Sequence, residues 1–238
     1  MMDFDTEIFI EDIHSFWAKN PIPVIHCGAH LAEEAADYYK HSFKPVVWIE
    51  AAPNLIPTLL RIIEQYPGDS VIEAALWSES KVKKTLRIAN NSYSSSLREF
   101  GTLRSTYPEI EYVSEVIVDT TTLDEIDIPN FRKYLLVLDL QGIELDVLLG
   151  AKEVLKRCEY VYLEVSKQEL YSGQAVWGQV DDFLVAKGFR LVDWQYSENY
   201  GWGNALYSSK TEHFVKFKQW LRRRRHLQRS LNLSSPKV

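Results

Sequence analysis

The sequence has few of the features that mark secreted, membrane-spanning or metal-binding proteins. Its 238 residues include two cysteines and six histidines, and neither type shows metal-ligand spacing. This predicts a reducing, cytoplasmic location and no metal site. No apolar run approaches the roughly 20 residues that span a bilayer. The acidic start MMDFDTEIFIED lacks the basic flank of a secretory signal.

Positive charge is also scarce in most of the chain. The net charge is −6, from 27 Lys and Arg against 33 Asp and Glu, but eight of the basic residues follow residue 212, where there is no acid. Residues 1–212 are therefore strongly acidic and are expected to repel nucleic acid. We predict one domain over 1–212 and a basic helical tail over 213–238. The tail is interpreted as a solvated helix end, with contact to an anionic membrane or to RNA as the less favoured alternative.

Short apolar runs recur along the chain with helical segments between them. Continuous apolar runs are typical of strands covered on both faces, and their alternation with helices predicts a parallel sheet. The predicted strands are 22–27, 46–50, 135–139 and 160–165, and the predicted helices are 29–39, 53–65 and 145–156. The run 112–119 leans to alternation and is interpreted as an edge strand, while 189–194 and 205–207 suggest a final antiparallel hairpin.

Chemically useful residues stand where these strands end. Gly28 follows the first strand, Glu50 ends the second and Asp139 ends the run LLVLD. Gly28 would let the backbone approach a ligand closely, and the helix 29–39 would aim its free N–H groups at the ligand's charged end. Glu50 follows Gly28 by 22 residues, the separation at which an acidic residue reaches the ribose hydroxyls of an adenosine. The turn 90–97 (NNSYSSSL) is expected to overhang the same edge.

The turn after the first strand discriminates between two cofactors. A dinucleotide needs several glycines so that its pyrophosphate lies against the helix start. Here Ala29, His30 and Ala32 occupy that turn, whereas S-adenosylmethionine has no phosphate and needs one close approach. The sequence therefore favours a methyl donor over NAD.

Four segments in order resemble the FkbM family of S-adenosylmethionine-dependent methyltransferases: VIHCGAHLAEEA, VVWIEAAPN, VIVDTTTLDEI and LLVLDLQGIELDVLLGAKEVL. The last segment carries the family's Asp-x-x-Gly-x-Glu pattern at Asp139, Gly142 and Glu144, followed by Gly-Ala at 150–151. SYSSSLREF and YVYLEVS are also similar to family segments. The resemblance implies an α/β, Rossmann-like class I methyltransferase fold. Its sheet would be seven-stranded and mostly parallel, with helices on both faces and an antiparallel C-terminal hairpin.

The chain departs from the family pattern at positions 26, 32 and 141, and matches it at position 30. The family usually has an acid at position 26, asparagine or histidine at 30, glycine at 32 and glutamate at 141, where this chain has His26, His30, Ala32 and Gln141. The missing first-strand acid leaves open how the cofactor's ammonium is held. A neutral His26 is expected to replace it in part by accepting one hydrogen bond.

The resemblance implies methyl transfer from S-adenosylmethionine to an oxygen of a small-molecule or glycan acceptor within the domain 1–212. Asp139, with or without Glu144, would orient or deprotonate the hydroxyl. Glu50 would hold the ribose and the 74–77 loop the adenine. The residues assigned to the cofactor are His26, Gly28, Ala29, His30, Glu50, Ala51, Ala75, Leu76 and Asp139. The residues assigned to the acceptor are Ser95, Ser96, Gln141 and Glu164.

Two other functions remain open. One is an NAD-dependent oxidoreductase, which the glycine-poor turn disfavours. The other is a non-catalytic module that keeps the fold while its basic tail binds a partner, a possibility that His26 and Ala32 support. Structural roles are the alternatives for single residues: Glu50 complementing a helix dipole, Asp139 capping a helix and Glu144 shaping a helix entrance. The sequence predicts neither the acceptor nor the oligomeric state.

Overall fold

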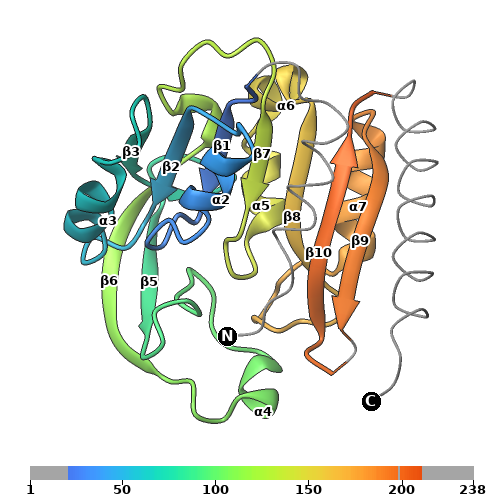
Figure 1. The fold of residues 1–238 in the computed structure, drawn as a ribbon. Helices are drawn as coiled ribbons and strands as arrows, with labels where there is room; N and C mark the ends of the chain where they lie inside the picture. Colours follow the sequence, from blue (N-terminus) through green and yellow to red (C-terminus); the bar gives the residue numbers. More distant parts are fainter. Residues whose placement is uncertain (1–20, 198, 211–238) are drawn as a thin grey trace, which may run out of the picture.

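The computed structural model describes residues 21–197 and 199–210. Its centre is a seven-stranded sheet in the order β3-β2-β1-β7-β8-β10-β9 (Figure 1). All neighbours pair in parallel except β10, which is antiparallel to both β8 and β9. The seven strands are β1 (Val24–Cys27), β2 (Val46–Glu50), β3 (Ser70–Glu73), β7 (Leu135–Leu138), β8 (Tyr160–Ser166), β9 (Arg190–Ser197) and β10 (Trp202–Ser208). The predicted sheet and its C-terminal hairpin are confirmed.

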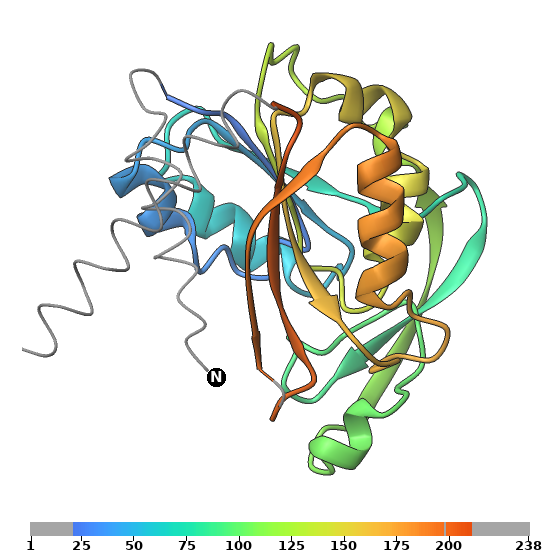
Figure 2. The ribbon, with the colours of Figure 1, turned by 90° about the vertical axis from the view of Figure 1, so that its right-hand side faces the viewer.

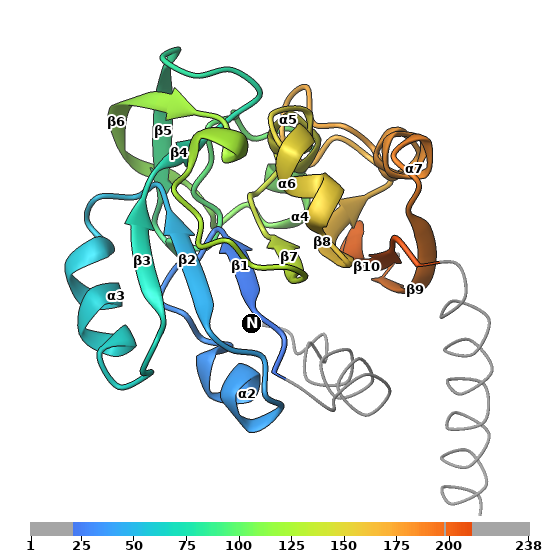
Figure 3. The same ribbon diagram turned by 90° about the horizontal axis from the view of Figure 1, so that it is seen from above.

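Helices cover both faces of this sheet, as predicted (Figure 3). On one face, α2 (Ala35–Lys40) and α3 (Ile56–Ile63) bury Tyr38 and Leu59 against alternate residues of β1, β2 and β7. On the other face, α5 (Glu144–Leu149), α6 (Lys152–Arg157) and α7 (Trp177–Ala186) form a second core with the remaining residues of the strands. Figure 2 shows α7 lying along β8, β9 and β10. Burial on both faces explains why the strands read as continuous apolar runs.

A second sheet of three strands was not predicted. It has the order β4-β6-β5, with β4 (Ala75–Leu76) parallel to β6 (Tyr112–Thr121) and β5 (Lys83–Ala89) antiparallel to it. Leu76, Leu86 and Ile88 join the core on the α5 face. The interpretation of 112–119 as an edge strand was wrong, because β6 is the middle strand of this sheet. Its partial alternation arises because one face is left in water, where the polar Glu115 and Asp119 are exposed together with the apolar Val113 and Ile117.

Three predicted helices are shorter than expected. The helix predicted over 29–39 begins at Ala35, because His30 and Ala32 take positive φ values of 44° and 55° in a non-helical turn. The helix over 53–65 is reduced to α3. The helix over 145–156 is divided into α5 and α6 at Gly150, where a Cβ would lie 2.7 Å from the Trp77 carbonyl oxygen. Short α4 (Leu103–Thr106) and the 3-10 turn η1 (Leu123–Glu125) complete the elements.

Candidate functional site

The order of the main sheet reverses between β1 and β7, and ligands of open parallel sheets bind at such a point. The two strands end side by side, and the Asp139 N–H donates to the Cys27 carbonyl at 3.0 Å. Gly28 has a φ of +87°, and a Cβ there would lie 1.8 Å from the carbonyl oxygen of Asp139. Gly28 is therefore required by the end of the neighbouring strand, whereas the sequence attributed it to contact with a ligand.

A cavity of about 110 Å³ opens at this edge, and we call it the Glu50 cavity. Loops after β1, β2 and β7 form one wall, and Ala74, Leu76 and Leu97 contribute apolar surface. The predicted site residues that line it are Gly28, His30, Glu50, Ala51, Leu76, Ser95, Asp139 and Gln141. The predicted overhang of the turn 90–97 is confirmed, since its residues contribute to the wall.

Glu50 is buried at the end of β2, and its carboxylate organises two loops. Oε1 accepts hydrogen bonds from the backbone N–H groups of Ala51 at 2.9 Å and Ala52 at 2.7 Å, and Oε2 accepts from His30 N–H at 2.8 Å. Burial raises the pKa of Glu50, and these three donors partly offset the rise. An ionised carboxylate has about four acceptor positions, so three are used within the protein and capacity for a further donor remains.

In the turn after β1, the backbone N–H groups from Gly28 to Ala32 all donate within the protein. The N–H groups of Gly28 and Ala29 both donate to the Ile49 carbonyl, and that of His30 to Glu50. Those of Leu31 and Ala32 donate to the Glu33 carboxylate and the Ala29 carbonyl. The expectation that a helix starting at Ala29 would aim free N–H groups at a ligand was therefore wrong.

The side chain of His30 connects this turn to the overhanging segment. Its Nδ1 lies 2.7 Å from Glu33 Oε1, its Nε2 lies 2.8 Å from the Ser92 hydroxyl, and its ring packs on Tyr93 with 4.2 Å between centroids. Burial opposes the charged imidazolium, but the Glu33 hydrogen bond and nearby carboxylates outweigh it and raise the pKa of His30. His30 thus fixes the turn and helps wall the cavity.

His26 lies within β1 and points toward α2. It is 3% exposed, its Nδ1 is 3.1 Å from the Tyr38 hydroxyl, and its ring stacks on Trp48 at 4.9 Å. Desolvation by burial lowers its pKa to about 4, so the imidazole is neutral near pH 7. It lines a separate space of about 120 Å³, the His26 cavity, which also reaches Glu34, Asp139 and Glu164.

Asp139 lies directly after β7, and Gln141 holds its carboxylate. The Gln141 Nε2 donates to Asp139 Oδ1 at 2.6 Å, while Gln141 Oε1 accepts from the Tyr171 hydroxyl at 2.7 Å. Gln141 adopts a φ of 54°, and the Ser96 hydroxyl holds its carbonyl at 2.7 Å. Desolvation raises the pKa of Asp139. Two predicted acceptor residues, Ser96 and Gln141, are therefore part of the support for this carboxylate.

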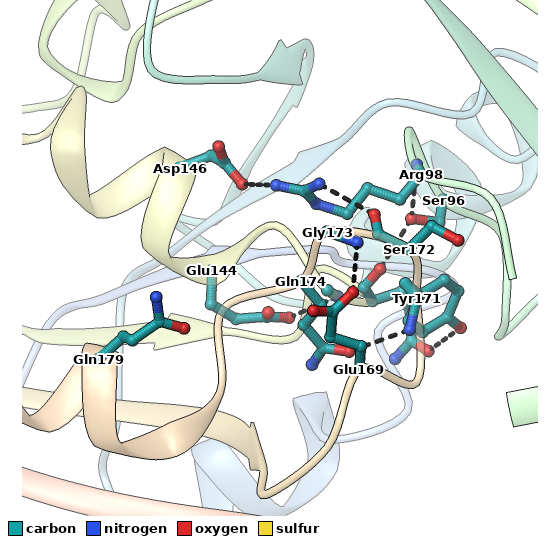
Figure 4. A network of polar contacts seen from close by, with 12 residues as sticks. Ser96, Arg98, Glu144, Asp146, Glu169, Tyr171, Ser172, Gly173, Gln174 and Gln179 are labelled. Atoms are coloured by element: carbon teal, nitrogen blue, oxygen red, sulfur yellow. Dashed lines mark hydrogen bonds and ion pairs between the residues drawn. The ribbon is translucent and has the colours of Figure 1, made fainter. Parts of the chain in front are cut away.

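Glu144 does not face the cavities beside Asp139, as a catalytic partner of Asp139 would. It is 4% exposed at the start of α5, and its Oε1 accepts from the backbone N–H groups of Leu140 at 3.0 Å and Gly142 at 3.2 Å. Burial raises its pKa to about 7. Figure 4 shows it on the same helix as Asp146, which forms an ion pair with Arg98 at 2.7 Å. Within the described residues, Glu144 closes the turn that carries Gln141 and is not among the residues that line the three cavities described here.

A large cavity of about 760 Å³ adjoins the Glu50 cavity and shares Gly28, His30, Tyr93, Asp139 and Gln141 with it. Asp139 is thus at the boundary between a narrow space and a wide one. Two further predicted site residues, Ala29 and Glu164, line the large cavity. Glu164 lies inside β8, which extends to Ser166, one residue beyond the predicted strand 160–165. Sequence reasoning missed several other wall residues, among them Glu34, Tyr107 and Tyr171.

The remaining predictions concern absences or residues outside these cavities. Within residues 21–197 and 199–210, no group of three or more His, Cys, Asp or Glu side chains is arranged to hold a metal ion. No helix in this described part is long and apolar enough to cross a membrane. The predicted basic tail 213–238 lies outside the described residues. Ala75 lies in β4 between two residues that line the Glu50 cavity, Ala74 and Leu76.

Known proteins share this sequence pattern and fold. The chain is 34% identical over 103 residues to the 2-O-methyltransferase NoeI of Sinorhizobium fredii (strain NGR234), a match over 42% of this chain and 41% of that protein. The chain thus matches about two fifths of the length of that relative. The magnesium protoporphyrin IX methyltransferase of Synechocystis PCC 6803, solved with bound SAM, superposes with a TM-score of 0.51 at 6% identity, over 88% of this chain and 86% of that one. The METTL16 methyltransferase domain superposes with a TM-score of 0.50 at 8% identity, over 85% and 66%.

These structural likenesses show the class I methyltransferase fold, and the sequence comparison shows the family. The sequence model of the methyltransferase FkbM domain matches residues 26–191. This range holds the end of β1, all of β2, β7 and β8, and the edge on which Gly28, Glu50 and Asp139 converge. The chain belongs to the FkbM methyltransferase family.

Proposed function

We propose that this methyltransferase transfers the methyl group of S-adenosylmethionine to a hydroxyl oxygen of a small molecule or glycan. The observation that carries the proposal is the turn after β1, whose N–H groups from Gly28 to Ala32 all donate within the protein. A dinucleotide's pyrophosphate would find no donors there. A sulfonium cofactor needs none, and the family membership and the name of the relative from Sinorhizobium fredii both support this choice of reaction.

The residues around the Glu50 cavity fit this donor. The remaining acceptor capacity of Glu50 suits a ribose hydroxyl, and the apolar side chains of Leu76, Leu97 and Ile143 suit an adenine ring. Carboxylates of the adjoining wall suit a cationic sulfonium. At 110 Å³ the cavity is small for the whole cofactor, so we expect the amino-acid end to extend past Gly28 into the large cavity.

Asp139 is the residue proposed to act on the acceptor. When bound, the donor supplies an electrophilic methyl group, and methyl transfer requires the acceptor oxygen to be held in line with it. Gln141 occupies Asp139 Oδ1, and no hydrogen bond to Oδ2 is formed among the described residues. Oδ2 is therefore free to accept the hydroxyl proton, and the raised pKa of Asp139 favours that transfer. Glu144 is proposed to keep the turn in place.

Calorimetry on the full chain tests the cofactor. S-adenosylhomocysteine is expected to bind with a stoichiometry of about one while NAD gives no heat beyond dilution. Preferential binding of NAD would refute the proposed reaction. A screen of hydroxylated metabolites and glycans, scored by formation of S-adenosylhomocysteine, then tests transfer to oxygen, and methylation of nitrogen or sulfur acceptors alone would contradict it.

A further inference from the structure

Three carboxylates from separate elements line the large cavity next to the proposed methyl position. Glu34 precedes α2, Asp139 follows β7 and Glu164 lies within β8, and all three also line the adjoining His26 cavity. They therefore share one region of the wall although they are far apart in the sequence. Neither cavity has a Lys or Arg in the wall formed by the described residues.

Nearby histidines do not neutralise these carboxylates. Desolvation lowers the pKa of His26 to about 4, so it is neutral at pH 7. His30 is engaged by Glu33, which with Glu109 adds two further carboxylates to the wall of the large cavity. Within the described part of the chain, the Glu34 side chain forms no hydrogen bond with another residue and no ion pair. Apart from His30, which Glu33 holds, the wall formed by the described residues thus has no cationic side chain.

The desolvation and mutual repulsion of these carboxylates favour a positively charged ligand in the cavity. Desolvation raises the pKa of Glu34 to about 7 and that of Glu164 well above its ordinary value, and the charge of Asp139 adds to the rise at Glu164. A cation placed among them would relieve both the desolvation and the mutual repulsion. The rings of Tyr107 and Trp202 lie on the same wall and supply faces that attract organic cations.

We propose that the methyl acceptor carries a protonated amine as well as the hydroxyl, as an amino sugar or an amino alcohol does, and that Glu34 and Glu164 bind this amine. The inference rests on the proposed function, because it assigns Asp139 to the reacting hydroxyl and the donor's sulfonium. The two remaining carboxylates are then left for the acceptor. An acceptor bearing phosphate or carboxylate would be repelled from the same wall.

Sugars of one size and different charge test this assignment. Binding of 2-amino-, 3-amino- and 6-amino-deoxyglucose, glucose and glucuronate to the full chain is measured by ligand-observed NMR, with and without S-adenosylhomocysteine. At least one amino sugar is expected to bind about tenfold or more tightly than glucose, the size of one charge-assisted hydrogen bond. Glucuronate is expected to bind more weakly than glucose.

Variants of the cavity carboxylates show which residues cause the preference for amino sugars over glucose. Glu34→Gln and Glu164→Gln are each expected to reduce the amino-sugar preference several-fold. The control is Glu64→Gln, the same change at an exposed position at the C-terminal end of α3 that lines none of these cavities. It should leave the amino-sugar preference unchanged. Equal binding of glucose and all amino sugars, or a preference that survives both cavity variants, would overturn the inference. Failure of S-adenosylhomocysteine to bind would instead count against the proposed function, since the sugar measurements without it stand alone.

Discussion

Replacement of Glu50 separates its two roles, in the fold and in cofactor binding. Its carboxylate accepts three backbone N–H groups, from His30, Ala51 and Ala52. Glu50→Gln keeps an oxygen for Ala51 and Ala52 but turns an amide N–H₂ toward the His30 N–H. Glu50→Ala leaves all three donors without their acceptor. These bonds are not visible in the sequence, and because of them the structure predicts that Glu50→Ala loses stability as well as cofactor affinity.

The magnitudes follow from the cost of unsatisfied donors. One buried donor without a partner costs about 1–3 kcal/mol. We therefore expect Glu50→Gln to lower the free energy of unfolding by about 1–2 kcal/mol, since it also removes the unfavourable burial of a charge. Glu50→Ala is expected to cost about 2–4 kcal/mol, because water entering the cavity satisfies part of the three donors. Loss of a charged acceptor for the ribose should weaken the binding of S-adenosylhomocysteine by roughly 1.5–3 kcal/mol in both variants.

Urea unfolding of the ligand-free variants measures the free energy of unfolding. Calorimetry at temperatures well below their unfolding midpoints measures the affinity for S-adenosylhomocysteine. Thr58→Ala, at an α3 position that is not among the residues lining the Glu50 cavity, is the control for mutation near the same loops. If Glu50→Gln and Glu50→Ala fold as stably as the wild type, the three backbone bonds are not important for stability. If both lose stability while binding S-adenosylhomocysteine normally, Glu50 is a structural residue and does not hold the ribose.

Four further predictions concern other parts of the chain. Asp139→Asn should leave S-adenosylhomocysteine affinity within about threefold while turnover of an identified acceptor falls by about 10²-fold, and full activity would remove Asp139 from the mechanism. Gly28→Ala should prevent stable folding in urea titrations. Gly188→Ala, with a similar φ of +90° and no atom within 4 Å of its Cβ, should lower the free energy of unfolding by only roughly 1–2 kcal/mol. Equal effects of the two changes would contradict the proposed clash with Asp139. Because the pKa of Glu144 is raised to about 7 in the folded state, the wild type should gain stability relative to Glu144→Gln as the pH falls from about 7 to 4.5, and melting temperatures that differ by a constant amount would argue against it. Removal of residues 217–238 should not change S-adenosylhomocysteine affinity, and a large loss would place that segment at the site.

The fold class was accessible from the sequence because burial on both faces leaves a local signal. The runs around Ile25, Val47 and Leu136 are continuous and apolar since every second residue meets helices on one side and the others meet helices on the other. The positions of Gly28, Glu50 and Asp139 followed from the same runs, because a parallel sheet collects its carboxyl ends at one edge. The Asp-x-x-Gly-x-Glu segment then indicated the family.

The partners of these residues were decided only by the tertiary structure. The three N–H groups at Glu50, the bond from Gln141 to Asp139 and the placement of Glu34 beside Glu164 join residues that lie 1 to 130 positions apart, and no common spacing marks them. The second sheet is of the same kind, because β4, β5 and β6 pair through contacts that neither propensity nor periodicity encodes. Local sequence determines which segments are strands and which of their faces are apolar. Long-range packing determines which polar groups are already satisfied within the protein, and therefore which remain available to a ligand.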